Sequence, residues 1–250
     1  MSGWLAIAGL GPGDERLVTP EVTVALDLAT DVVGYIPYVR RVAPREGLVR
    51  HESDNREEID RARQALALAA RGRRVVVVSS GDPGVFAMAS AVFEAMEQGD
   101  PGWRSIDVRV LPGVTAMLAA AARAGAPLGH DFCVLNLSDN LKPWDLVARR
   151  LQLAVEADLA MAFYNPRSTA RPEGFGRVLE LLSTLCEPGR ILIFARAVTT
   201  AEEEITVVPL SQARPEMADM RTMVLVGSSA TRVIAREGTP FVYTPRSVPS

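Results

Sequence analysis

Four loops rich in glycine, proline and small polar residues follow apolar segments of the chain. They span residues 9–14, 79–86, 111–116 and 162–166. Glycine has no side chain, so each loop lets a ligand lie directly against the backbone. In an open parallel sheet, ligands bind beyond the carboxyl ends of the strands, where such loops gather. The pattern predicts a ligand site built largely from backbone.

The first loop, Gly9-Leu10-Gly11-Pro12-Gly13-Asp14, has the outline of the G-x-G-x-x-G dinucleotide fingerprint. Its sixth position is Asp14, whose carboxylate repels a pyrophosphate, and Pro12 lacks the N–H that an anion-binding loop needs. These two residues disfavour a dinucleotide-dependent dehydrogenase. Two interpretations stay open for the loop, close approach to another ligand or a plain strand-to-helix turn.

The second loop contains Ser79-Ser80-Gly81-Asp82-Pro83-Gly84-Val85-Phe86. Asp82 can accept hydrogen bonds from a ligand, or it can cap the helix that is expected to follow. The chain has neither a G-x-S-x-G nucleophile elbow nor a Walker A lysine. The usual machinery of serine hydrolases and nucleotide triphosphatases is therefore missing.

The segments around these loops predict an α/β fold. Apolar, β-branched segments alternate with helix-period segments up to residue 125, which is typical of βαβ units on a parallel sheet. Two adjacent strands near the end predict a mixed sheet in the second half. The Gly- and Pro-containing segment 125–129 is the best candidate linker, so we expect domains at 1–125 and 126–250. Residues 54–72 form the clearest helix, with Asp54 and Glu57 as a capping box and Glu57 and Arg61 paired on a solvated face.

Composition and charge exclude several classes of protein. The 250 residues carry a formal charge of −3, so we expect no nucleic acid partner. The apolar run 4–10 has no basic region before it, and no run reaches the ~20 apolar residues of a membrane span. Two cysteines and two histidines match no metal motif, and we expect no metal. We expect a cytoplasmic protein without a membrane partner.

Taken together and in this order, the loops resemble the tetrapyrrole methylase family, the class III S-adenosylmethionine-dependent methyltransferases. The family signatures are matched by 9–14, by Gly81-Asp82-Pro83 and by Pro112-Gly113-Val114-Thr115-Ala116. The resemblance covers nearly the whole chain. It implies two α/β domains that form a cleft for S-adenosyl-L-methionine, which leaves as S-adenosyl-L-homocysteine, and a homodimer.

The resemblance also implies positions that contact the cofactor. In this chain they fall on Pro12, Gly81, Asp82, Val85, Thr115, Ala116, Tyr164, Asn165, Ala197 and Thr222. Members that methylate uroporphyrinogen tend to have Met after the tyrosine, whereas this chain has Asn165. Further segments at 33–38, 53–57, 164–168 and 242–246 resemble those members that methylate a corrinoid precursor and contract its ring in cobalamin synthesis.

A corrinoid precursor is a small-molecule tetrapyrrole with several carboxylates, which arginine binds well. Residues 32–74 hold ten arginines against six acidic residues, a net +4 in a chain of −3. We expect Arg40, Arg41 and Arg50 to bind substrate before the arginines of the helix, which surface ion pairs and the helix dipole also explain.

Methyl transfer to a ring carbon needs alignment rather than a side-chain nucleophile. The implied ring contraction exchanges protons and needs an acid or base, for which the candidates are His51, Asp54, Tyr35 and Arg196. Asp54 as a helix cap and His51 as a surface residue are alternatives. Other activities also stay open: a sibling methylase on another precursor or on its cobalt-containing form, or a non-catalytic tetrapyrrole-binding protein.

Overall fold

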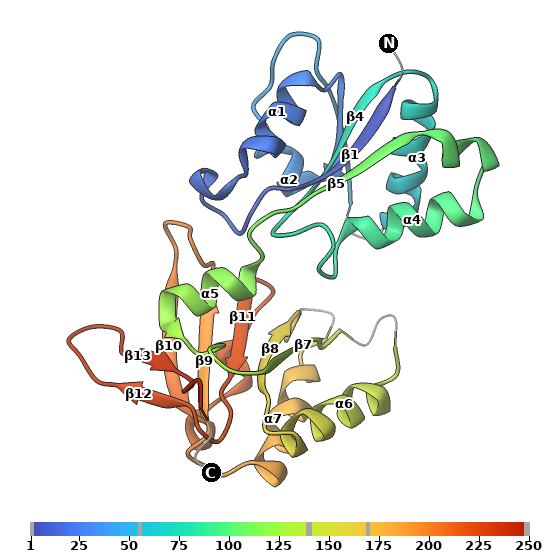
Figure 1. The fold of residues 1–250 in the computed structure, drawn as a ribbon. Coiled ribbons are helices and arrows are strands. Elements are labelled where there is room, and N and C mark those ends of the chain that lie inside the picture. The colour runs from blue at the N-terminus through green and yellow to red at the C-terminus, as the bar shows by residue number, and fades with distance from the viewer. Residues whose placement is uncertain (1–2, 55–56, 139–141, 169–170, 248–250) are drawn as a thin grey trace. The chain divides into compact units, whose positions relative to one another are not determined.

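The computed structural model describes residues 3–54, 57–138, 142–168 and 171–247 (Figure 1). The chain divides into two compact α/β units, Met1–Thr115 and Ala116–Ser250, called unit 1 and unit 2 below. The sequence analysis placed the end of the first domain at residue 125. In the structure the division comes earlier, because helix α5 (Ala116–Ala124) packs against strands of unit 2.

Unit 1 is built on a five-stranded parallel sheet with the order β3-β2-β4-β1-β5. Its strands are β1 (Trp4–Gly9), β2 (Asp31–Tyr35), β3 (Val49–Ser53), β4 (Arg74–Ser79) and β5 (Asp107–Leu111). The predicted parallel sheet is thus confirmed. Strand β3 was missed because its residues, Val-Arg-His-Glu-Ser, are mostly polar and lie at the exposed edge of the sheet.

Helices cover both faces of this sheet, and each face has its own apolar core. Helices α3 (Glu58–Ala70) and α4 (Met88–Gln98) cover one face, and α1 (Pro20–Leu28) and α2 (Ile36–Val39) cover the other. Short 3₁₀ turns are η1 (Glu15–Leu17) and η2 (Pro101–Ser105). Because both faces are buried, the central strand β1 is apolar and β4 is apolar between its end residues, Arg74 and Ser79.

The starts of α1 and α3 differ in how they are capped. Thr19 caps α1, since its hydroxyl accepts a hydrogen bond from the Val22 N–H at 3.4 Å. The capping box predicted for α3 is wrong, because the helix begins at Glu58 and no side chain caps it. Arg61 is 3% exposed, so its predicted place on a solvated helix face is also wrong.

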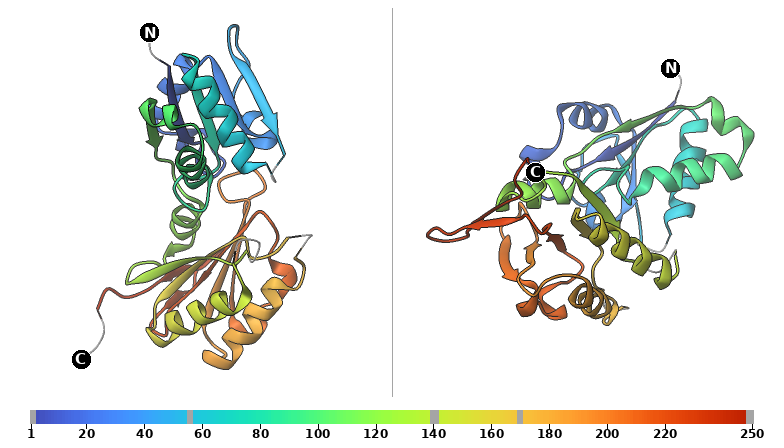
Figure 2. Two further views of the ribbon diagram at one scale, coloured as in Figure 1. Left: turned by 90° about the vertical axis from the view of Figure 1, so that its right-hand side faces the viewer. Right: turned by 60° about the horizontal axis from the view of Figure 1, so that its bottom comes forward.

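Unit 2 has a five-stranded mixed sheet with the order β10-β9-β11-β8-β7. Its strands are β7 (Phe132–Asn136), β8 (Ala160–Tyr164), β9 (Ile191–Arg196), β10 (Glu204–Pro209) and β11 (Thr222–Val226). Strand β11 runs antiparallel to both β8 and β9, while β7 and β8 are parallel. Helices α6 (Trp144–Glu156) and α7 (Gly174–Leu185) cover one face of this sheet (Figures 1 and 2).

The predicted linker 125–129 is part of the fold rather than a free connection. Strand β6 (Gly125–Ala126) pairs with β13 (Phe241–Tyr243), which pairs in turn with β12 (Arg232–Ile234). Two further 3₁₀ turns are η3 (Leu210–Gln212) and η4 (Pro215–Met217). Strand β6 has two residues, too few to show the alternation that identifies a strand. Its glycine was therefore interpreted as part of a linker.

No helix among the described residues is long and apolar enough to cross a membrane. No group of three or more His, Cys, Asp or Glu side chains in this part of the chain is placed to hold a metal ion.

Candidate functional site

The carboxyl ends of all five parallel strands share one edge of unit 1, called here the carboxyl edge of unit 1. The loops after β1, β4 and β5 meet there, as the sequence analysis predicted from their glycines. These loops carry the candidate cofactor residues of this unit, which are Pro12, Gly81, Asp82, Val85 and Thr115.

Three glycines let these loops approach within contact distance of one another. A Cβ on Gly113 would lie 2.1 Å from the carbonyl oxygen of Gly81, and a Cβ on Gly9 would lie 2.5 Å from the same oxygen. Gly11 and Gly81 also exchange backbone hydrogen bonds of 2.9 and 3.2 Å. A larger residue at Gly9 or Gly113 would therefore push these loops apart.

The Asp82 carboxylate joins two of these loops. One oxygen accepts a hydrogen bond from the Gly84 N–H at 2.8 Å, and the other accepts one from the Gly113 N–H at 3.0 Å. The cap of α4 is Ala87, so the alternative that Asp82 caps this helix is excluded. Asp82 instead fixes the β4 loop against the β5 loop.

Arg41 performs a similar task for the β1 loop. Its guanidinium donates hydrogen bonds to the carbonyl oxygens of Gly11 at 3.1 Å and Gly13 at 3.3 Å, and to that of Leu10. Burial lowers the pKa of Arg41. These contacts fix Arg41 to the β1 loop. Its predicted contact with substrate stays a prediction.

Two tyrosines lie at the same edge: Tyr35 is the last residue of β2, and Tyr38 belongs to α2. The rings of Tyr35 and Tyr38 meet edge to face with centroids 5.3 Å apart. Burial is the largest cause of the raised pKa of Tyr38, and the neighbouring Tyr35 raises it further. Arg41, Arg61 and a hydrogen bond with Ser80 lower this pKa, but by less. Sequence reasoning named Tyr35 and missed Tyr38, although both belong to the segment 33–38 that carries the finer resemblance.

Asp54 follows β3 at this edge, and its carbonyl oxygen accepts a hydrogen bond from Arg61 at 2.6 Å. Arg61 also donates to the Ser53 hydroxyl at 2.8 Å and contacts the Met88 sulfur at 3.4 Å. Burial lowers the pKa of Arg61. This buried guanidinium therefore holds the end of β3 against α4. Residues 55–56 of the predicted segment 53–57 lie outside the described residues.

His51 lies within β3, and its ring points to the first residue of β2. Its Nε2 lies 2.9 Å from an Asp31 carboxylate oxygen, and its Nδ1 lies 3.2 Å from the Gln64 amide. Asp31 is 2% exposed and also accepts hydrogen bonds from Arg73 and Thr30, both at 2.7 Å. Burial alone would raise the pKa of Asp31, but these partners hold it below its usual value. These contacts give His51 a structural role, and its catalytic role stays a prediction.

In unit 2, the candidate residues also gather at one edge of the sheet. The carboxyl ends of β7 and β8 meet in register at Asn136 and Tyr164, and the end of β9 lies in register with the start of β11 at Arg196 and Thr222. We call this the binding edge of unit 2. Antiparallel β11 brings its amino end here, which is why Thr222 joins residues that follow other strands.

Asp219 organises the Arg196 side of this edge. It accepts hydrogen bonds from Arg196 Nε and from the Thr222 hydroxyl, both at 2.8 Å. Burial alone would raise the pKa of Asp219, but these hydrogen bonds hold it below its usual value. The sequence analysis missed Asp219, because a lone aspartate before a strand carries no recognisable signal.

Tyr164 and Asn165, at the end of β8, contact α5 and the end of β7 respectively. The Tyr164 hydroxyl accepts a hydrogen bond of 3.3 Å from the Met117 N–H at the start of α5, one residue after the candidate Ala116. The Asn165 amide donates to the Asn136 side-chain oxygen at 3.2 Å. This pairing accounts for an amide at Asn165 without reference to a ligand.

Strained backbone gathers in these loops. Four non-glycine residues with positive φ follow strands at the two edges: Phe86 (53°), Asn165 (51°), Ala197 (46°) and Thr199 (68°). The left-handed conformation costs a residue with a Cβ about 1–2 kcal/mol. Such strain persists where the surrounding structure enforces it, and it is concentrated in functional sites.

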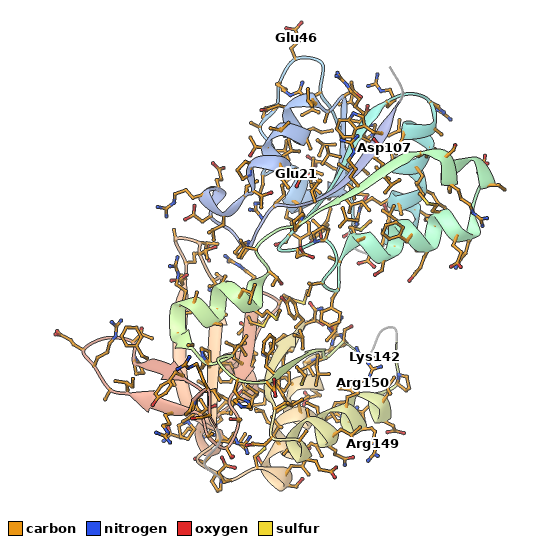
Figure 3. All side chains as sticks on the ribbon, in the orientation of Figure 1. Glu21, Glu46, Asp107, Lys142, Arg149 and Arg150 are labelled. Atoms are coloured by element: carbon orange, nitrogen blue, oxygen red, sulfur yellow. The ribbon has the colours of Figure 1, made fainter. Side chains whose placement is uncertain are left out.

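The remaining candidates, Arg40 and Arg50, are exposed. Arg40 forms a long ion pair of 3.8 Å with Glu52, and Arg50 donates to the Val42 carbonyl at 3.5 Å. A second group of cations, Lys142, Arg149 and Arg150, lies just before and along α6 (Figure 3). These three fall outside the basic segment considered from sequence.

The sequence pattern of the family described as Tetrapyrrole (Corrin/Porphyrin) Methylases matches residues 5–214. A Sinorhizobium protein named "Precorrin-3B C(17)-methyltransferase" is 51% identical over 98% of this chain and 97% of its own length. "Cobalamin biosynthesis protein CobIJ" of Mycobacterium tuberculosis is 47% identical over 100% of this chain, which spans only 49% of that relative. A "Probable cobalt-factor III C(17)-methyltransferase" of Salmonella typhimurium is 36% identical over 97% of this chain and 98% of its own.

Solved structures of methyltransferases also resemble this chain. The "methyltransferase CobJ" is 67% identical, with a TM-score of 0.93 over 98% of this chain and 100% of that one. A Thermus thermophilus uroporphyrin-III C-methyltransferase complexed with S-adenosylhomocysteine is 21% identical, with a TM-score of 0.66 over 90% and 97% of the two chains, and shares the fold. The resemblance drawn from the loops is thus confirmed: the chain belongs to the tetrapyrrole (corrin/porphyrin) methylases.

Proposed function

We propose that this chain transfers a methyl group from S-adenosyl-L-methionine to C-17 of precorrin-3B and contracts the ring to give precorrin-4, a step of cobalamin biosynthesis. The observation that carries the proposal is the 51% identity with a precorrin-3B C(17)-methyltransferase, which extends over nearly the full length of both chains. The loops that carry the family signatures lie inside this matched region.

The residues of the carboxyl edge of unit 1 suit the cofactor. A Cβ at Gly9 or Gly113 would collide with the Gly81 carbonyl oxygen, so these glycines bring the three signature loops together, where one ligand can contact all of them. In unit 1 we assign Pro12, Gly81, Asp82, Val85 and Thr115 to binding of S-adenosylmethionine. In unit 2 we assign Ala116, Tyr164, Asn165, Ala197 and Thr222.

When bound, S-adenosylmethionine supplies an electrophilic methyl group. The residues of this chain then have to hold donor and acceptor about 3 Å apart and aligned. Asp82 and Arg41 meet this need in unit 1, because Asp82 joins the loops after β4 and β5 and Arg41 holds the loop after β1. Asp219 does the same in unit 2 for Arg196 and Thr222.

Ring contraction requires proton transfer at the macrocycle. Of the four candidates, we place Tyr35 and Asp54 first, because both stand at strand ends on the carboxyl edge of unit 1. His51 and Arg196 are second, since Asp31 and Asp219 respectively engage their side chains. For the substrate carboxylates, Arg40 and Arg50 come before Arg41, whose guanidinium is occupied by backbone carbonyls.

The second candidate substrate is the cobalt-containing form of the same precursor, which the 36% identical Salmonella relative favours by its name. A panel assay separates the two: initial rates with precorrin-3B, cobalt-factor III and one other precorrin, under identical conditions. We expect precorrin-3B to be methylated at least tenfold faster than the others. A preference for cobalt-factor III would replace the proposed substrate, and binding of all three without turnover would indicate a tetrapyrrole-binding protein.

We further propose that the enzyme works in the cytoplasm as a homodimer, as the family resemblance implies. Light scattering coupled to gel filtration tests the second part. A mass near twice the 26.9 kDa of one chain is expected, and a monomer at micromolar concentration would contradict it.

A further inference from the structure

Phe86 combines two unfavourable features at one position. Its backbone φ of +53° lies in the left-handed region, where a residue with a Cβ is strained. Its aromatic side chain is also 49% exposed. A glycine or asparagine would avoid both, because neither is apolar and both tolerate this conformation. A residue that retains both features is a candidate for ligand contact.

The surrounding loop holds Phe86 in this conformation from both sides. Before it, the Val85 N–H donates to the Asp82 carbonyl at 3.3 Å, and the Asp82 carboxylate accepts from the Gly84 N–H. After it, the Ala89 N–H donates to the Pro83 carbonyl at 2.9 Å as α4 begins. The strained residue is therefore part of a braced turn rather than of a loose loop.

The position of this turn points to the substrate. It follows β4 at the carboxyl edge of unit 1, and Phe86 comes directly after Val85, which we assign to the cofactor. The candidate substrate residues named so far are arginines, which suit the carboxylates at the rim of a tetrapyrrole. The broad apolar face of such a ring needs a different partner, and an aromatic side chain provides one.

We propose that Phe86 is a substrate-binding residue whose ring packs against the face of the cyclic tetrapyrrole and helps to select it. The inference rests on the proposed function, since it takes its substrate class from there. Within one loop, Phe86 would therefore bind the macrocycle, and Gly81 and Asp82 would bind the cofactor.

The test measures binding of precorrin-3B to the complex with S-adenosylhomocysteine, by quenching of tryptophan fluorescence, in four proteins. Phe86→Leu keeps a large apolar side chain but removes the ring, and Phe86→Tyr keeps the ring. Phe93→Leu is the matched control, because Phe93 is 47% exposed on α4. We expect the Kd for precorrin-3B to rise about tenfold in Phe86→Leu, the loss of one stacking contact. It should stay within about twofold of wild type in the other two.

The affinity for S-adenosylhomocysteine, measured by calorimetry, should be unchanged in Phe86→Leu. A wild-type Kd for precorrin-3B in this variant would overturn the inference, and so would weakening confined to S-adenosylhomocysteine, which would assign the ring to the cofactor. Turnover of precorrin-3B by the wild-type protein tests the proposed function separately, so either can fail alone.

A second pair of variants tests the strain on which the inference stands. Phe86→Gly and Phe86→Ala both remove the ring, and they differ by one Cβ. At a residue with positive φ, the glycine variant should melt at the higher temperature, the reverse of the usual order. Both should show the raised Kd for precorrin-3B. A higher melting temperature for Phe86→Ala would contradict the strained backbone.

Discussion

The carboxylate of Asp82 accepts a hydrogen bond from the Gly113 N–H at 3.0 Å and thereby fixes the loop after β4 to the loop after β5. Its second oxygen accepts from the Gly84 N–H, two residues along its own loop. One side chain thus sets the relative position of two of the loops that carry the family signatures.

Replacing Asp82 with asparagine should weaken cofactor binding. The amide offers one neutral acceptor oxygen where the carboxylate offers two charged ones, so one backbone N–H loses its acceptor and the other keeps a weaker one. We expect about tenfold weaker affinity for S-adenosylhomocysteine, which corresponds to about 1.4 kcal/mol. Asp100→Asn is the matched control, because Asp100 also accepts from an N–H two residues on, Gly102 at 2.8 Å, on an exposed turn. Equal affinities in the two variants would contradict this role of Asp82.

A methyl group on Gly113 should separate the loops. The Cβ of Gly113→Ala would lie 2.1 Å from the Gly81 oxygen, so the backbone must shift. We expect the free energy of unfolding to fall by about 1–3 kcal/mol, as for overpacking, together with loss of calorimetric binding of S-adenosylhomocysteine. Gly189→Ala should change neither quantity, because its Cβ would meet nothing within 4 Å. Normal cofactor affinity in Gly113→Ala would place the cofactor away from this junction.

Arg41→Lys should loosen the β1 loop. A lysine ammonium cannot reach the three carbonyl oxygens of Leu10, Gly11 and Gly13 that the planar guanidinium reaches together. Thermal unfolding should show that the free energy of unfolding falls by about 1–2 kcal/mol. Arg63→Lys, at an exposed ion pair with Asp60, should lose less than about 0.5 kcal/mol. If both variants unfold alike, Arg41 does not support the loop.

Asp219→Asn should weaken the cofactor site in unit 2. The substitution removes the charge that holds Arg196 and one acceptor for the Thr222 hydroxyl. We expect S-adenosylhomocysteine to bind about fivefold more weakly, equivalent to about 1 kcal/mol. The control is Asp107→Asn, at an exposed ion pair between Asp107 (Figure 3) and Arg109 in unit 1. An unchanged Kd in Asp219→Asn would remove Asp219 from the site.

Asp31 should make the stability of the protein sensitive to acid. Hydrogen bonds from Arg73, His51 and Thr30 outweigh burial and hold its pKa below the usual 3.8. A group with a depressed folded pKa stabilises the fold above its unfolded pKa, and this contribution is lost as pH falls through the folded value. Urea unfolding between pH 5 and pH 2 should therefore show a steep loss below about pH 4.

The variant Asp31→Asn isolates this contribution to the pH dependence. Asparagine does not titrate, so the slope of stability against pH below about pH 4 should become shallower. Asp60→Asn, at the exposed ion pair with Arg63, should keep the wild-type slope. A wild-type slope in Asp31→Asn would show that other carboxylates dominate acid unfolding.

The sequence predicted the apolar strands buried on both faces, but it missed the polar edge strand β3. Strand β4 contains the run Val75-Val76-Val77-Val78, which signals a central parallel strand without any tertiary information. Strand β3 is polar and exposed, so its pairing with β2 depends on the neighbouring strand rather than on its own residues.

In the site, likewise, features set by local sequence were predicted and features set by distant contacts were not. Glycines at strand ends revealed the loops, because their role depends on local backbone. The partners that fix these loops could not be predicted, since Asp82 and Gly113 are 31 residues apart and Arg41 reaches Gly11 across 30. Arg61 was placed on a solvated face because its spacing from Glu57 suggested a surface pair, whereas the fold buries it beside Met88.

The proposed methyl transfer is tested by incubating the protein with precorrin-3B and S-adenosylmethionine carrying a ¹³C-labelled methyl group. We predict that NMR of the product places one labelled methyl at C-17 of a ring-contracted macrocycle, with one S-adenosylhomocysteine released for each methyl transferred. Label at another carbon, or no label in the macrocycle while the protein still binds both compounds, would contradict the account.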